Sequence, residues 1–68
     1  MPVTPFDMQK ARDALEKAKR ALKDAEKRFD RECSPENMAS LIREIQLHER
    51  RVADARSAVH RLVERAKH

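Results

Sequence analysis

Ser34-Pro35-Glu36-Asn37 is the one helix-breaking stretch between two long runs of helix-forming residues. Proline disfavours helix in the residue before it, so a helix that reaches this stretch must end. Serine is a favoured N-cap and proline is favoured in a first turn, so a second helix can begin at once. A connection this short turns the second helix back along the first, which predicts an antiparallel helical hairpin.

On each side of this break, apolar residues recur three and four apart, with one histidine among them. The residues in these positions are Met8, Ala11, Leu15, Ala18, Leu22, Ala25 and Phe29, then Met38, Leu41, Ile45, His48, Val52, Ala55, Val59, Leu62 and Ala66. This spacing puts a narrow stripe on each helix that is suited to packing against another helix. We expect the two stripes to form one seam along the length of the hairpin.

The boundaries follow from capping residues. Thr4 can cap the first helix, Pro5 suits its first position, and Asp7 can complete a capping box. We expect the first helix over residues 5–31, the turn over 32–34 and the second helix over 35–67, in a single domain. The predicted fold class is therefore all-α, a coiled-coil-like antiparallel hairpin of two helices.

The composition and the motifs limit the classes of function that this chain can have. Forty-one per cent of the residues are charged, none is glycine and the net charge is +4. No apolar run approaches the ~20 residues of a membrane span, and no signal peptide is evident. One cysteine agrees with a reducing compartment, so we expect a cytoplasmic protein. No phosphate loop, catalytic constellation or metal-ligand set is present, which predicts a non-enzymatic protein without metal or cofactor.

Apolar residues also lie beside the two stripes. Ala14 and Ala21 flank the first stripe, and Ile42 and Val63 flank the second. Since two helices only half-enclose their seam, we expect a second copy or another protein's helices to cover this extra width and complete a four-helix bundle. His48 joins this predicted interface as a selector of register or partner, unless its imidazole simply points to water.

These features favour a protein-interaction module: an adaptor, a co-chaperone or a small inhibitor such as those encoded by phages. The hairpin plan and the Ser34-Pro35-Glu36 opening of the second helix resemble the small needle-subunit co-chaperones of type III secretion. That resemblance implies a helical protein as the partner.

A nucleic-acid-binding hairpin is the alternative. The alternating leucine and alanine layers resemble those of small antiparallel RNA-binding hairpin dimers that regulate plasmid copy number. Acidic residues on the outer face of the first helix reduce its net charge to +2, and neither phenylalanine lies there to stack on a base. The basic residues of that face are Lys10, Lys17, Arg20, Lys23, Lys27 and Arg31.

Overall fold

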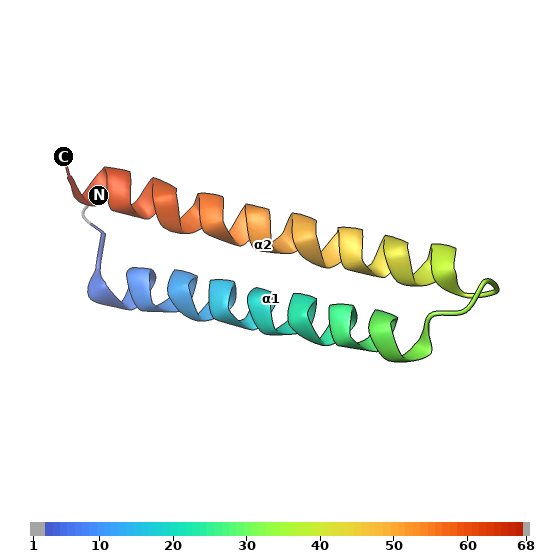
Figure 1. Cartoon of the computed structure of the whole chain (residues 1–68). Coiled ribbons are helices and arrows are strands. Elements are labelled where there is room, and N and C mark those ends of the chain that lie inside the picture. The colour runs from blue at the N-terminus through green and yellow to red at the C-terminus, as the bar shows by residue number, and fades with distance from the viewer. Residues whose placement is uncertain (1–2, 68) are drawn as a thin grey trace.

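The computed structural model describes residues 3–67 of the 68-residue chain. These residues form two α-helices, α1 (Pro5–Glu32) and α2 (Met38–Ala66). The helices lie side by side and run in opposite directions from a single turn (Figure 1). The molecule is a rod of 51 × 14 × 12 Å. The all-α hairpin predicted from the sequence is therefore confirmed, and neither helix has an apolar segment long enough to cross a membrane.

The start of α1 is the capping box expected from the sequence. The backbone N–H of Asp7 donates to Thr4 Oγ1 at 3.1 Å, and the backbone N–H of Thr4 donates to Asp7 Oδ2 at 3.4 Å. Pro5 occupies the first helical position, where its missing N–H leaves no hydrogen bond unmade. The helix ends at Glu32, one residue beyond the expected boundary.

The start of α2 differs from the expectation. The helix begins at Met38 rather than at residue 35, and Asn37 is its N-cap residue. Asn37 Oδ1 accepts hydrogen bonds from both the backbone N–H and the hydroxyl of Ser34, at 2.8 and 3.0 Å, while its Nδ2 donates to the carbonyl of Glu32 at 2.9 Å. The Ser34 hydroxyl donates to this amide. Asn37 rather than Ser34 is the N-cap, and residues 35–37 form a turn. At the other end, α2 stops at Ala66, one residue before the expected boundary.

The predicted seam lies between the helices, but it is only partly enclosed. Ala25, Leu41 and Val52 are buried, with 5–8% of their surface exposed. The other seam residues are half-buried, except Met38 and Ala66 at the two ends of α2, which are exposed. Within residues 3–67, no large side chain falls below 2% exposure. Two helices alone therefore give this chain a thin core, as expected for its size.

Candidate functional site

The hairpin has two long edges, one on each side of its seam. On one edge, Arg28 Nη1 of α1 lies 3.5 Å from Glu44 Oε2 of α2. Because residues seven apart lie on the same side of a helix, this pair locates two rows of side chains. We call these rows the alanine edge, which consists of Asp7, Ala14, Ala21 and Arg28 on α1 and Glu44, Arg51, Ala58 and Arg65 on α2.

Two shallow grooves are cut into the alanine edge, one toward each end of the rod. The groove nearer the turn is lined by Ala21, Asp24, Ala25, Arg28, Glu44 and His48. The groove nearer the chain ends is lined by Asp7, Lys10, Ala11, Ala14, Leu62 and Arg65. Two alanines and two charged residues line the α1 side of each groove.

Apolar side chains along this edge remain open to solvent. Ala14 and Ala58 are exposed, and Ala21 is half-buried. Leu47 is 48% exposed and lies three residues after Glu44, which places it beside the same row of α2. Leu47 was not among the residues singled out from the sequence, because it falls outside the three-four series. Its spacing from Glu44 was the signal that could have found it.

Ile42 and Val63 lie on the opposite edge. Ile42 precedes Glu44 by two residues, so the two side chains point roughly 160° apart around the axis of α2, on opposite sides of the seam. Val63 lies three heptads after Ile42, on the same side of α2. Ile42 is 40% exposed and Val63 is half-buried. Of the five interface residues expected from the sequence, Ala14, Ala21 and His48 therefore adjoin one edge, while Ile42 and Val63 lie on the other.

His48 is half-buried in the wall of the groove nearer the turn. Its Nδ1 atom is shielded from solvent and has no hydrogen-bond partner among the described residues. Shielding of Nδ1 does not test whether the imidazole points to water through its other nitrogen, so that alternative stays a prediction. Leaving a buried polar atom without a hydrogen-bond partner destabilises a fold by about 1–3 kcal/mol, so a hydrogen bond to Nδ1 would stabilise this site.

Arg28 is the most connected charge on the alanine edge. Its Nε donates to Glu32 Oε2 at 2.8 Å within α1, while its Nη1 lies near Glu44 of α2. The hydrogen bond to Glu32, followed by the charges of Glu44 and Glu32, raises the pKa of Arg28. The guanidinium therefore stays charged and ties the two helices together at the turn end of the edge.

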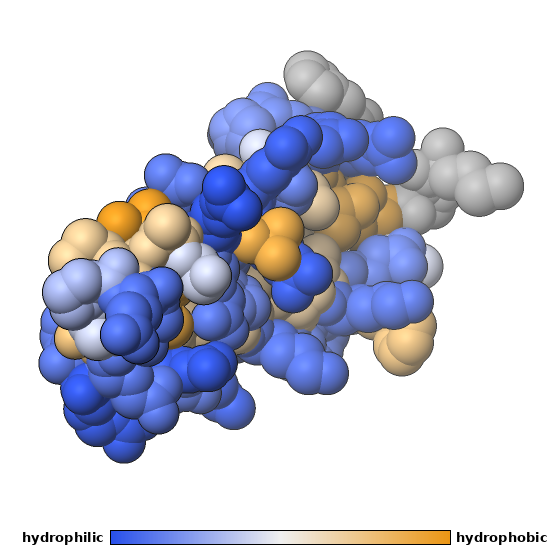
Figure 2. Space-filling model, turned by 90° about the vertical axis from the view of Figure 1, so that its right-hand side faces the viewer, coloured by the Kyte–Doolittle hydropathy of each residue, from blue (hydrophilic) through white to orange (hydrophobic). Residues whose placement is uncertain are grey.

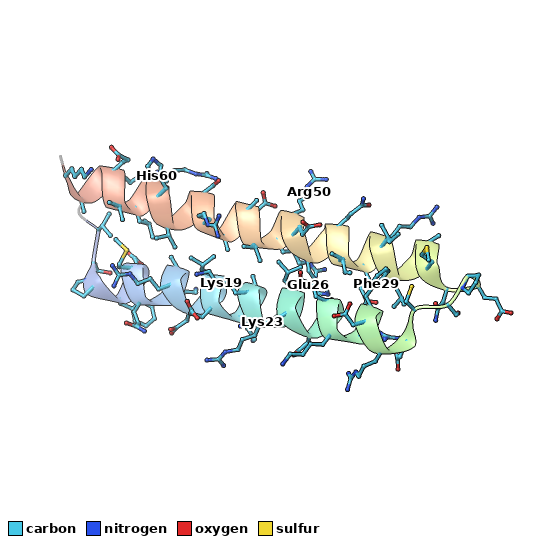
Figure 3. All side chains as sticks on the ribbon, viewed as in Figure 1. Lys19, Lys23, Glu26, Phe29, Arg50 and His60 are labelled. Carbon is cyan, nitrogen blue, oxygen red and sulfur yellow. The ribbon has the colours of Figure 1, made fainter. Side chains whose placement is uncertain are left out.

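The basic residues of the alternative hypothesis all lie exposed on α1. Figure 3 shows Lys23 projecting from α1 away from α2, and Arg50 and His60 projecting from α2 away from α1. Acidic side chains are interleaved with the α1 cations and are equally exposed, namely Asp13, Glu16, Asp24 and Asp30. This outer face is thus a mixed charged surface. Hydrophilic side chains also cover much of the turn end, with apolar atoms visible between them (Figure 2).

Within residues 3–67, no group of three or more His, Cys, Asp or Glu side chains is placed to hold a metal ion. Cys33 is a free, half-buried thiol at the turn. Comparison with protein-family models gave no match, and comparisons with curated proteins and with solved structures gave none either.

Proposed function

We propose that this chain is a non-enzymatic, cytoplasmic protein–protein interaction module, and that its alanine edge is the surface that binds. The partner is a helical surface, supplied by a second copy or by another protein. An adaptor, an inhibitor and a co-chaperone like those of type III secretion are narrower forms of the same proposal.

The observation that carries this proposal is the pair of grooves along the alanine edge, with Leu47 exposed beside them. Small side chains let a second helix approach closely, and close approach is what creates dispersion contacts. The thin core supports the same conclusion, because few side chains of the lone hairpin are well buried. Covering this edge would bury Ala14, Ala21 and Leu47 together.

The test is affinity capture from the host with the tagged chain and two matched variants. Ala14→Arg places a long cation in the groove nearer the chain ends and should abolish capture of a specific helical protein, or of the untagged chain itself. Ala53→Arg makes the same chemical change at an exposed position outside this edge and should leave capture intact. Equal capture by both variants would contradict the proposal.

The alternative function, nucleic-acid binding, is favoured by one observation. Among the described residues, none of the six outer-face cations of α1 lies within 4 Å of a carboxylate, so all six are free to meet phosphates. This function predicts a mobility shift with duplex RNA that weakens steeply as salt rises. Replacing Lys23 and Lys27 by glutamine should then reduce the salt dependence, whereas the same change would leave helix binding at the alanine edge unaffected.

A further inference from the structure

We propose that the alanine edge is covered by a second copy of this chain, related by a two-fold axis across the rod so that the two turns lie at opposite ends. This inference rests on the proposed function and names its partner. It predicts a four-helix bundle in which α1 packs against α1 of the second copy and α2 packs against α2.

The charges at the ends of the edge have matching spacing on the two helices. Asp7 and Arg28 are 21 residues apart on α1, and Glu44 and Arg65 are 21 residues apart on α2. Each interval is about 32 Å of helix. In both helices the acid comes first and the base second, so a reversed copy of either helix sets each acid against a base.

The acid–base pairs between the two α1 helices and those between the two α2 helices can form in the same dimer, because Arg28 and Glu44 already face each other across the seam. At each end of the dimer, Asp7 and Arg65 of one copy meet Arg28 and Glu44 of the other. The four side chains then form a ring of alternating sign. A symmetric interface uses the same patch twice, so one edge supplies two such rings.

The apolar features match under the same symmetry. The groove nearer the chain ends of one copy faces the groove nearer the turn of the other, since the axis exchanges the two halves of the edge. Ala14 comes to lie opposite Ala21 of the second copy. Leu47 reaches the level of Leu62 of the second copy, but on the outer side of the α2 row.

The footprint is adequate for a stable dimer. A face of 51 by 14 Å offers about 700 Å² per copy, close to the roughly 800 Å² per partner that specific interfaces bury. Small side chains at the centre of the α1 row favour close packing of α1 against α1 of the second copy. A second copy that covers this face along its whole length would therefore make an interface of ordinary size.

The net charge of the two ends selects the orientation. Residues 3–14 and 56–67, at the end away from the turn, carry six basic and three acidic side chains, whereas residues 26–43 around the turn carry four of each. A dimer with both turns at one end would place two +3 regions side by side. Turns at opposite ends separate them along the 51 Å rod, well beyond the Debye length of ~8 Å.

The native cysteine provides the first test. A spin label on Cys33 should give a dimer whose labels lie about 45 Å apart, the rise of 31 helical residues. A dimer with both turns at one end would give less than about 25 Å, because packed helices lie only 8–10 Å apart. A monomer by sedimentation equilibrium at millimolar concentration, or the short distance, would overturn the inference. A second label at Glu36→Cys, in a Cys33→Ser chain, checks that labelling a half-buried thiol has not disturbed the result.

The sign of a charge at Ala58 provides the second test. In the proposed dimer, Ala58 lies opposite Arg51 of the second copy. Ala58→Glu should therefore tighten dimerisation about two- to tenfold, since it creates two exposed ion pairs. Ala58→Arg should weaken dimerisation at least tenfold, and circular dichroism should show both variants equally helical.

The control is the same pair of changes at Ala53, which should alter the dimerisation constant by less than about twofold. If Ala58→Glu and Ala58→Arg change the dimerisation constant equally, position 58 does not lie opposite Arg51 of the second copy and the proposed dimer is wrong. A chain that stays monomeric but still captures a foreign helix through this edge would overturn the self-association and leave the proposed function standing.

Discussion

The two edges of the hairpin border the same seam but differ in what they present to a neighbour. The alanine edge has small side chains at the centre of its α1 row, Arg51 beside Ala58 at the centre of its α2 row, and charges at its ends. The opposite edge has long charged side chains along its length, with Ile42 and Val63 toward its ends. Its charged residues are Arg12, Lys19, Glu26, Glu49 and Arg56. Exposed large apolar residues do not distinguish the two edges, because Ile42 lies on the second edge and Leu47 lies beside the alanine edge. The alanines Ala14, Ala21 and Ala58 are what set the alanine edge apart.

Truncation to alanine should cost far more stability in the seam than at its margins. Leu41 is 5% exposed and Ile42, the next residue, is 40% exposed. We expect Leu41→Ala to lower the free energy of unfolding by about 2–4 kcal/mol, because it removes buried methyl groups and leaves a cavity. Ile42→Ala should cost less than about 1 kcal/mol. Chemical denaturation followed by circular dichroism measures both, and a comparable loss at Ile42 would mean that the second edge is covered after all.

The turn provides a smaller effect. Asn37→Ala removes the three side-chain hydrogen bonds that tie residues 32, 34 and 37 together. We expect it to lower the free energy of unfolding by about 1–2 kcal/mol. Since the turn sets the register that brings Arg28 to Glu44, self-association through the alanine edge should weaken as well. Asn37→Asp keeps the acceptor oxygen and should recover part of the loss; an Asn37→Ala chain as stable as the parent would show that the seam alone fixes the register.

The smallest effect concerns the ion pair across the alanine edge. Arg28 and Glu44 are both partly exposed, so a double-mutant cycle to alanine should give a coupling energy of about 0.2–1 kcal/mol. The cycle should be measured in an Ala14→Arg background that keeps the chain monomeric. The same cycle on Lys19 and Glu49 of the opposite edge should give a value near zero. Equal coupling on the two edges would contradict the distinction drawn between them.

The sequence predicted the features that depend on local spacing. The hairpin, the seam and the capping box at Thr4 follow from three-four periodicity and from contacts within four residues. The start of α2 was misplaced because the Asn37 amide bonds to residues 32 and 34 and holds residues 35–37 in a turn, and a local pattern does not rank such alternatives.

The division into two edges was also missed from the sequence. Ala14 and Ile42 each flank a stripe, but Ala14 directly precedes a seam residue and Ile42 directly follows one, so an antiparallel pair places them on different edges. The Arg28–Glu44 contact identifies the edge to which Ala14 belongs. The shielding of His48 Nδ1 likewise depends on the packing of both helices, so sequence spacing alone left its environment open.

The most direct test of the central claim is a dilution series of ¹H–¹⁵N spectra of the unmodified chain. As concentration rises, the amide signals of Ala14, Ala21 and Ala58 should shift together along one binding curve, while those of Ile42 and Val63 stay fixed. Shifts confined to Ile42 and Val63, or spectra that do not change up to millimolar concentration, would contradict the account of self-association through the alanine edge.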